Sequence, residues 1–268
     1  MSTYDSKTWI KYLPPLDEEG NPPPRPPRYE KSGLILVDKP ADLSSMDVLR
    51  VIKKIGNIKK AGHGGTLDPF ATGLLPVLLN QATRLSTALL RGDKQYEGTM
   101  IFGQEYDTQD TTGTPVGEPL PLTQDLTLTH LNELAKQYEG TIRQIPPVFS
   151  AIKKEGRPLY DYARKGEAIE PEAREVEVRR FEVVEEVGPG QFTFFVDCGK
   201  GVYVRTLIHD LAKSANHVAA VSTLRRIRVG NLDISQAIKL EEITSQEVID
   251  EVLVEPEEIA ERFGVRLG

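Results

Sequence analysis

Hydrophobic and polar residues alternate over two neighbouring stretches of the chain, Val176–Val187 and Gln191–Val196, and such alternation predicts half-buried strands. Between them lies Gly188-Pro189-Gly190, a composition typical of a turn, so we expect an antiparallel hairpin. A third alternating stretch covers Tyr96–Phe102, and the apolar run Leu34–Val37 predicts a buried strand.

Apolar residues at helical spacing predict several helices. Ser44-Ser45-Met46-Asp47 offers N-caps to a helix that continues to about Ile55. A short strand is predicted to end at Tyr203-Val204, directly before a helix over Arg205–Ala215. These elements predict an α+β fold with a mostly antiparallel sheet and helices against it. Two further helices are predicted over Thr83–Leu90 and Thr129–Tyr138.

The two ends of the chain differ in composition from the middle. Residues 1–32 hold seven of the 19 prolines, which excludes a packed helix and predicts a flexible or surface-draped extension. Docking of this segment to a proline-binding domain is an alternative. Folded structure is expected to begin near Gly33 and to extend to residue 240. A short acidic segment over residues 241–268 follows, because residues 241–262 hold nine acidic residues and one arginine.

Composition narrows the class of protein. Hydrophobic residues make up 39% and charged residues 27% of the 268 residues, which suits a globular protein with a core. No apolar run is long enough to span a bilayer, and the first residues show no secretory signal. Cys198 is the only cysteine and the four histidines are scattered, so neither an intrachain disulfide nor zinc-ligand spacing is present. We expect a cytoplasmic protein without membrane or metal partners.

The net charge of −7 argues at first against a nucleic-acid partner, but the acidic residues gather near the C-terminus. Basic residues elsewhere come in pairs, which is compatible with a phosphate-rich partner. The alternative is that each pair is an ordinary solvated part of the surface. The pairs include Lys53-Lys54, Lys59-Lys60, Lys153-Lys154, Arg164-Lys165, Arg179-Arg180 and Arg225-Arg226.

The run from Gly62 to Gly73 places one carboxylate, Asp68, among glycines, His63 and Pro69, a composition typical of a tight loop. A phosphate-binding loop has a lysine after its glycines and no central acid, so nucleotide binding is disfavoured. Asp68 is therefore either a turn residue or a nucleophile that faces a cleft.

Two later blocks offer further candidates. Tyr96 opens a predicted strand, where its ring could belong to the core or could stack on a base. Arg205 lies at a predicted strand-to-helix junction, from which it could either form a surface ion pair or keep a buried carboxylate ionised.

Taken in order, the blocks resemble the TruB family of pseudouridine synthases. The resemblance covers about residues 33–256 and is specific because several motifs occur in the family's order. The motifs are Gly33 to Lys39-Pro40, Gly62-His63-Gly64-Gly65-Thr66-Leu67-Asp68-Pro69, Lys94-Gln95-Tyr96-Glu97-Gly98, Gly103 to Gly113, Ile145 to Lys153, Leu159 to Gly166 and Tyr203-Val204-Arg205-Thr206-Leu207.

The resemblance implies the pseudouridine synthase fold and the isomerisation of uridine to pseudouridine in the TΨC loop of tRNA, position 55, by a monomer that uses no metal or cofactor. It implies that Asp68 is the nucleophile, on ribose or on uracil, and that Arg205 pairs with it. It also implies that Tyr96 stacks on the flipped base and could help to remove the C5 proton. His63 would fill the vacated space in the RNA loop. The other implied site residues are Tyr203 and Leu224 in the base pocket, Lys39 and Pro40 as shaping residues, and Lys153, Lys154, Arg157, Arg164 and Lys165 on phosphates.

The resemblance also implies a catalytic domain over residues 33–240 with an RNA-gripping insertion at about 124–166. Two departures stand out. Bacterial members usually have threonine where this chain has Gly64, and the segment after residue 241 is too short and acidic for the family's usual PUA domain. The open alternatives are a synthase for another RNA, including the guide-RNA-dependent branch, an RNA-folding chaperone, and a protein-interaction role for the Pro-rich segment.

Overall fold

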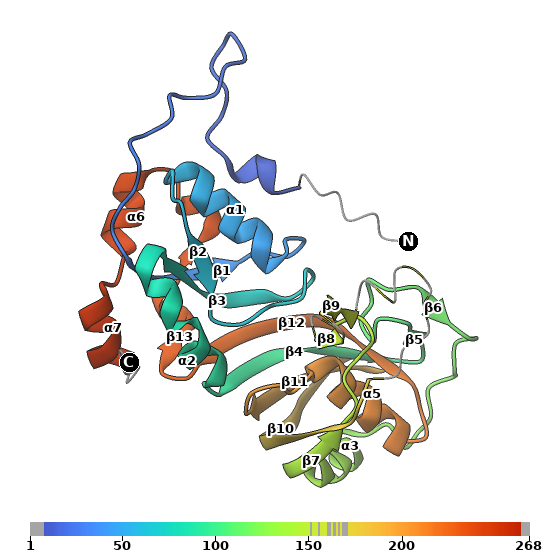
Figure 1. Ribbon diagram of the computed structural model, residues 1–268. Coiled ribbons are helices and arrows are strands. Elements are labelled where there is room, and N and C mark those ends of the chain that lie inside the picture. Colours follow the sequence, from blue (N-terminus) through green and yellow to red (C-terminus); the bar gives the residue numbers. More distant parts are fainter. Residues whose placement is uncertain are drawn as a thin grey trace. The chain divides into compact units, whose positions relative to one another are not determined.

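The computed structural model describes residues 8–150, 152–154, 156–159, 162, 165, 167 and 171–263 (Figure 1). These residues form two compact units, one from Asp93 to Leu224, the other from the residues up to Gly92 and from Arg225 onward. Strand β12 (Ala219–Val229) contributes residues to both units. Among the described residues, no helix is both long and apolar enough to cross a membrane.

The first unit is built on a sheet with the strand order β12-β4-β11-β10-β7, in which the pairs from β4 to β7 are antiparallel. The predicted hairpin is confirmed: β10 and β11 pair across a turn at Pro189-Gly190. Phe192, Phe194 and Val196 of β11 are buried because alternate side chains point to one face of the strand. The other strands of this sheet are β4 (Lys94–Phe102), β7 (Gly140–Gln144), β10 (Arg174–Gly188) and β11 (Gln191–Cys198). Two short pairs of strands are separate from it: β5 (Glu105–Tyr106) with β6 (Pro115–Val116), and β8 (Lys153–Lys154) with β9 (Arg157–Pro158).

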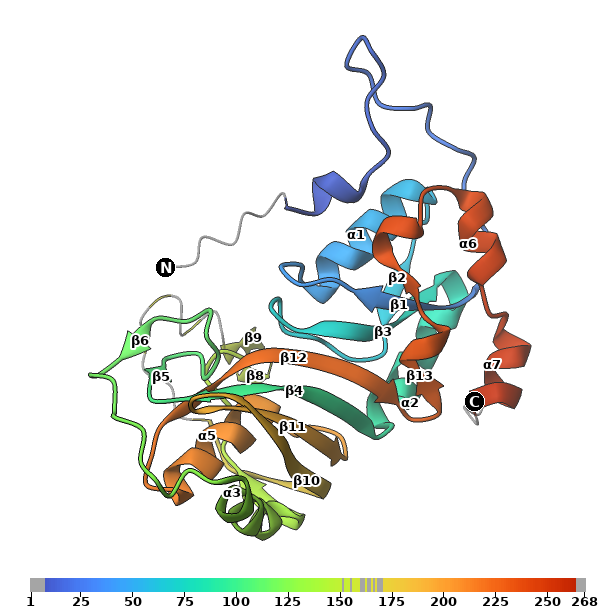
Figure 2. The ribbon, with the colours of Figure 1, turned by 180° about the vertical axis from the view of Figure 1, so that it is seen from behind.

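Two helices pack on the first unit's sheet (Figure 2). Helix α3 (Leu128–Ala135) is fixed to β10 by Asn132, whose side chain donates to the carbonyl of Val183 at 2.7 Å and accepts from its N–H at 2.9 Å. The turn η3 (Lys136–Tyr138) extends α3, so the helix predicted to end at Tyr138 is confirmed with a 3₁₀ end. Helix α5 (Val204–Ser214) confirms the prediction at Arg205–Ala215 within one residue at each end.

The second unit has the strand order β14-β1-β3-β12, with β2 on β3 and β13 on β12. Strand β1 confirms the predicted apolar strand, and nearly every residue of β1 and β3 is buried. The strands of the second unit are β1 (Gly33–Lys39), β2 (Ala61–His63), β3 (Thr72–Leu79), β13 (Leu232–Asp233) and β14 (Ile238–Lys239). Its helices are α1 (Ser45–Ile55), α2 (Ser86–Arg91), α6 (Gln246–Val252) and α7 (Pro256–Phe263), and its 3₁₀ turns are η1 (Thr8–Tyr12), η2 (Asn80–Leu85), η4 (Ile234–Gln236) and η5 (Leu240–Glu242).

The predicted caps of α1 are confirmed. The Ser44 hydroxyl accepts from the N–H of Asp47 at 3.1 Å, and the Asp47 carboxylate accepts from the N–H of Ser44 at 3.1 Å. This capping box fixes where the helix begins. The helix predicted over Thr83–Leu90 is instead the 3₁₀ turn η2 followed by the α-helical turns of α2.

The prediction of a short strand ending at Tyr203-Val204 is wrong. Strand β11 ends at Cys198, and Tyr203 is the N-cap of α5. Val202, Tyr203 and Val204 have the composition of a strand, but tertiary hydrogen bonds to Tyr203, described below, decide its conformation.

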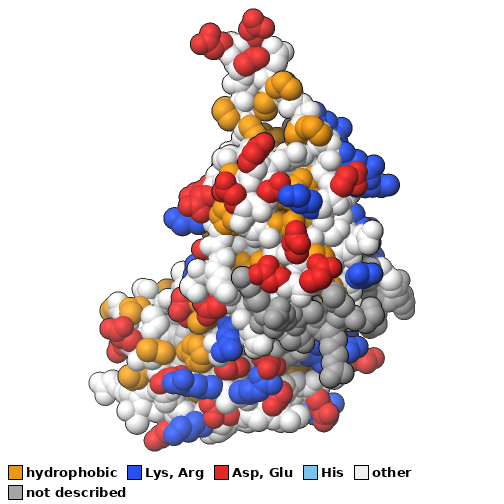
Figure 3. Space-filling view, turned by 90° about the vertical axis from the view of Figure 1, so that its left-hand side faces the viewer, with side chains coloured by type: hydrophobic (Ala, Val, Ile, Leu, Met, Phe, Trp, Pro, Cys, Tyr) orange, Lys and Arg blue, Asp and Glu red, His pale blue; other side chains and the backbone are white. Residues whose placement is uncertain are grey.

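The N-terminal segment already packs on the second unit before Gly33, the residue near which folded structure is expected to begin. Tyr29 is buried, its hydroxyl donates to Asp250 at 2.6 Å, and its backbone pairs with Ile58, so packing begins before Gly33. The preceding loop projects, and acidic side chains gather at its end (Figure 3). These are the exposed Asp17, Glu18 and Glu19.

The acidic C-terminal segment, as far as the structure describes it up to residue 263, forms helices α6 and α7, and it packs on the second unit. Val254, between α6 and α7, exchanges two backbone hydrogen bonds with Leu34 of β1, at 2.8 and 2.9 Å. Ile249 and Ile259 are fully buried, while the acidic residues of these helices lie mainly on the exposed side. The acidic residues therefore form the solvated face of two amphipathic helices.

Candidate active site

Asp68 lies in an irregular loop between β2 and β3, as its composition predicts. Its side chain is half-buried, and its carbonyl accepts from the N–H of Ala71 at 3.1 Å in a tight turn. The neighbouring Leu67 and Ala71 point into the core and are 3% and 0% exposed. The loop is therefore anchored by apolar residues on both sides of the half-buried Asp68.

Ser45, at the start of α1, fixes the residue before Asp68. Its hydroxyl accepts from the N–H of Leu67 at 2.9 Å and donates to the carbonyl of Leu67 at 3.2 Å. Ser45 is 2% exposed, so water does not compete for these bonds. The sequence predicts Ser45 only as a cap, because Leu67 lies 22 residues away along the chain.

Lys39, the last residue of β1, fixes the residue after Asp68. Its ammonium donates to the carbonyls of Pro40, Leu43 and Pro69 at 2.8, 2.7 and 3.1 Å. Burial lowers the pKa of Lys39 to about 7, and attraction to the Asp68 carboxylate opposes this shift. Lys39 thus contacts both Pro40 and the Asp68 loop, and the shaping role of Lys39 and Pro40 stays a prediction.

Arg226 of β12 was missed as a site residue because a charged residue in a basic cluster is usually exposed. It is 1% exposed. Its guanidinium donates to the carbonyls of Gly65, Thr66 and Leu74 at 3.0, 3.3 and 2.8 Å. These carbonyls lie before and after Asp68 in the chain.

His63 ends β2 and is close to the same loop. Its Nδ1 accepts from the N–H of Gly65 at 3.3 Å, which leaves the Nε2 position to carry the proton of a neutral ring. Burial, with the positive charge of Arg226 as a second cause, lowers the pKa of His63. The imidazole is therefore neutral at pH 7.

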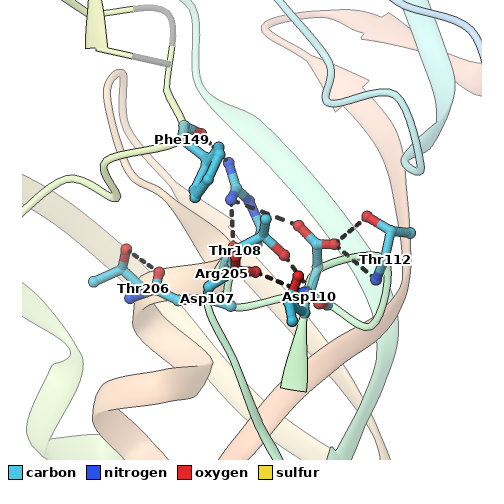
Figure 4. Close-up of polar contacts among 9 residues, drawn as sticks. Asp107, Thr108, Asp110, Thr112, Phe149, Arg205 and Thr206 are labelled. Atoms are coloured by element: carbon cyan, nitrogen blue, oxygen red, sulfur yellow. Dashed lines mark hydrogen bonds and ion pairs between the residues drawn. The ribbon is translucent and has the colours of Figure 1, made fainter. Parts of the chain in front are cut away.

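Arg205 lies in the first turn of α5, in the first unit, and is 3% exposed. Its guanidinium donates to the carbonyls of Thr108 and Phe149 at 2.5 and 2.8 Å and lies 3.6 Å from the carboxylate of Asp110 (Figure 4). Phe149 belongs to the predicted insertion, so Arg205 joins that segment to the loop at residues 107–114.

That loop is itself tightly fixed. The Asp110 carboxylate accepts from the N–H and hydroxyl of Thr112, at 3.0 and 2.5 Å, and it is 4% exposed (Figure 4). Thr206, next to Arg205, donates to the side chain of Gln109 at 2.9 Å. Sequence analysis noted this stretch only through its family resemblance and assigned it no role.

Tyr96 lies on β4, where it is 9% exposed and pairs with Val196 of β11. Gly98, further along β4, lies against β12: a Cβ there would be 2.2 Å from the carbonyl oxygen of Thr223. Only glycine permits this approach. Leu224, which follows Thr223 and is 6% exposed, therefore lies on the strand next to Tyr96.

Tyr203 is held by a residue that sequence analysis missed. The side chain of Gln144, at the end of β7, accepts from the N–H of Tyr203 at 2.8 Å and donates to its carbonyl at 3.1 Å. Gln144 is 2% exposed. These two bonds hold Tyr203, the extended N-cap residue, in place directly before α5 begins at Val204.

The predicted phosphate contacts fall on a partly described segment. Lys153 and Lys154 form β8, which pairs with β9, and Arg157 forms an ion pair with Glu167 at 2.9 Å. Lys165 is exposed, and Arg164 lies outside the described residues.

The structure thus gathers the candidate residues in two groups. In the second unit Asp68 shares one loop environment with His63, Lys39 and Pro40. In the first unit Tyr96, Leu224, Tyr203 and Arg205 lie on β4, β12 and the start of α5. The pairing of Arg205 with Asp68 stays a prediction. Within the described ranges, no group of three or more His, Cys, Asp or Glu side chains is placed to hold a metal ion.

Two family models match the chain. The first, TruB family pseudouridylate synthase (N terminal domain), matches residues 53–204. The second, tRNA pseudouridylate synthase B C-terminal domain, matches residues 205–260. The second match includes the acidic segment after residue 241, and neither model is a PUA domain.

Similar proteins have been named in bacteria. The chain is 43% identical over 232 residues to tRNA pseudouridine synthase B of Cupriavidus pinatubonensis, covering 86% of this chain and 73% of that protein. It is 41% identical over 212 residues to tRNA pseudouridine synthase B of Bordetella avium, covering 78% and 85%. A solved Cbf5-Nop10-Gar1 complex contains a chain with 30% identity and a TM-score of 0.60, covering 87% of this chain but only 57% of that one.

Proposed function

This chain belongs to the TruB family of pseudouridylate synthases, and we propose that it isomerises uridine to pseudouridine at position 55, in the TΨC loop of tRNA. The observation that carries the proposal is the Asp68 loop, in which buried groups fix the backbone around the half-buried Asp68. Relatives named tRNA pseudouridine synthase B support tRNA as the substrate.

The proposed reaction rearranges bonds within one nucleotide. The bond between ribose C1′ and uracil N1 breaks, a bond between C1′ and C5 forms, C5 loses a proton and N1 gains one. No atom or electron is gained overall, so the reaction needs no redox partner. Asp68 would act as the nucleophile, at ribose C1′ or at uracil C6, and its bond to that carbon would break again before the product leaves.

The other residues would hold the substrate. Arg205 would pair with Asp68 through its guanidinium. The target base must leave its stack, and Tyr96 would stack on it while Tyr203 and Leu224 line its pocket. A neutral His63 suits the predicted role of filling the vacated space in the RNA loop, since it brings no buried charge.

We further propose the following organisation. Residues 33–240 form the catalytic domain, and the insertion at about 124–166 grips the T arm, with Lys153 and Lys154 on phosphates. Residues 1–32 form an extension, and residues 241–268 form the acidic C-terminal segment. The protein would act in the cytoplasm as a monomer.

The test is to incubate the purified protein with an unmodified tRNA transcript and to map pseudouridine. We expect product at position 55 from the wild type and none from Asp68→Asn. Asp42→Asn is the matched control, because Asp42 is exposed and its φ of 63° lies in a region that asparagine tolerates. Its activity should equal that of the wild type.

Each other outcome removes part of the proposal. An inactive wild type would refute the enzymatic function and favour an RNA-folding role. Product at another position, or only when a guide RNA is added, would refute the proposal that position 55 of tRNA is the substrate. Equal activity in Asp68→Asn would exclude Asp68 as the nucleophile.

A further inference from the structure

Arg226 is among the largest fully buried side chains of the described residues, yet it belongs to no group that the proposed reaction uses. Its guanidinium donates to three backbone carbonyls, two before Asp68 (Gly65 and Thr66) and one after it (Leu74). One planar guanidinium thus joins both ends of the loop that carries the carboxylate.

The strand register explains how Arg226 reaches these carbonyls. Arg226 pairs in parallel with Gly73 of β3, and a Cβ at Gly73 would lie only 2.3 Å from the carbonyl oxygen of Arg226. Gly73 also has a φ of 98°, which favours glycine. The close approach of β12 to the first residues of β3 therefore depends on Gly73.

We propose that Arg226 is a positioning residue, which fixes the backbone on both sides of Asp68 and so holds the carboxylate where it meets the target nucleotide. This inference rests on the proposed function. Arg226 touches the loop backbone and not the reacting atoms, so its effect on the reaction passes through Asp68.

The fork of the guanidinium is what this role requires. It presents donors in fixed directions, and Nε, Nη1 and Nη2 each meet a different carbonyl. A lysine at this position keeps the positive charge but offers one compact ammonium. Arg226→Lys therefore separates the geometry of the fork from the charge. A displacement of about 1 Å at a reacting group costs on the order of 100-fold in rate.

The experiment compares wild type, Arg226→Lys and Arg226→Met, with Arg228→Lys as a matched control. Arg228 is exposed on the same strand and donates to the carbonyl of Gly230. For each protein we measure the single-turnover rate on unmodified tRNA, the Kd for that tRNA, the unfolding midpoint, and amide hydrogen exchange over residues 64–71. Assays are run at a temperature at which each variant is folded.

For Arg226→Lys we expect a rate about 10- to 100-fold below wild type, a Kd within about threefold, and faster exchange over residues 64–71. Arg228→Lys should match the wild type in all four measurements. A wild-type rate in Arg226→Lys, an equal loss in rate and tRNA affinity, or loss of the fold would overturn the positioning role. If the wild type itself proves inactive on tRNA, the proposed function fails separately. Unchanged amide hydrogen exchange over residues 64–71 in Arg226→Lys would still refute the positioning role.

Discussion

The ammonium of Lys39 donates to the carbonyl oxygen of Pro69, the residue that follows Asp68, at 3.1 Å. The last residue of β1 therefore fixes the turn that presents the carboxylate. Lys39 is fully buried, and the attraction of Asp68 partly offsets the burial that lowers the pKa of its ammonium to about 7. The charges of the two residues are thus linked, and removal of either one changes the environment of the other.

Lys39 gives the stability of the protein a recognisable pH dependence. In the unfolded chain its pKa is that of a free lysine, about 10.4, so between pH 7 and 10 the unfolded state binds more protons than the folded state. The free energy of unfolding of the wild type should rise through this window relative to Lys39→Met, by at most ~5 kcal/mol. Denaturant unfolding at a series of pH values measures this difference.

The control for Lys39 is Lys136→Met, because Lys136 is exposed at the end of α3. Its stability should keep a constant offset from the wild type across the same pH range. Parallel pH profiles for wild type and Lys39→Met would show that the buried ammonium has an ordinary pKa.

Gly64 has no room for a side chain. A Cβ there would lie 2.8 Å from the Cβ of Leu89 and 3.3 Å from the Cβ of Pro76, so Leu89 occupies space that the family's usual threonine would need. We expect Gly64→Ala to destabilise the protein by about 1–3 kcal/mol through overpacking. In a Leu89→Ala background the same change should cost less, with a coupling of about 0.5–3 kcal/mol in a double-mutant cycle.

Gly62→Ala is the matched control for this cycle, since its Cβ would meet Thr83 at an ordinary 3.6 Å. It should be tolerated in both backgrounds. An additive cycle for Gly64 and Leu89 would contradict the proposed complementarity.

Local composition was enough to place Asp68 in a loop, to locate the caps of α1 and to pair β10 with β11. Each of these depends on residues close together in sequence: glycines and Pro69, Ser44 with Asp47, and the turn after Gly188. Strand β3 was not predicted, because Pro76 interrupts its apolar run and proline is uncommon inside strands.

The groups that fix Asp68 could not be predicted, since their partners are distant in sequence. Arg226 and Lys39 are buried only because backbone carbonyls from other elements accept their hydrogen bonds. A charged residue without known partners is expected at the surface. The same limit applies to Tyr203, whose extended backbone is held by the distant side chain of Gln144 and not by a neighbouring strand.

Gln144 can therefore be tested as the residue that starts α5. Gln144→Met keeps the approximate volume but removes the acceptor of the Tyr203 N–H, at a cost of about 1–3 kcal/mol where buried, while the Tyr203 carbonyl still accepts from the N–H of Leu207 at 3.0 Å. Because Tyr203 is half-buried, we expect a loss of about 1–2 kcal/mol in the free energy of unfolding. Gln137→Met, at an exposed position in η3, should change it by less than about 0.5 kcal/mol. Equal stabilities of the two variants would refute this role of Gln144.

Substitution of Lys59 and Lys60 tests whether this basic pair binds phosphates of the proposed tRNA substrate. Both are exposed directly before β2, the strand that leads to His63. Removal of one lysine–phosphate interaction should reduce the slope of log affinity against log salt by about 0.7–0.9, so Lys59→Met with Lys60→Met should reduce it by up to about 1.8. Binding is measured by filter retention at several salt concentrations. Lys31→Met is the control, because Lys31 already pairs with Asp250 at 2.9 Å and should contribute less. An unchanged slope in the double variant would mean that these lysines are part of the solvated surface and do not bind RNA.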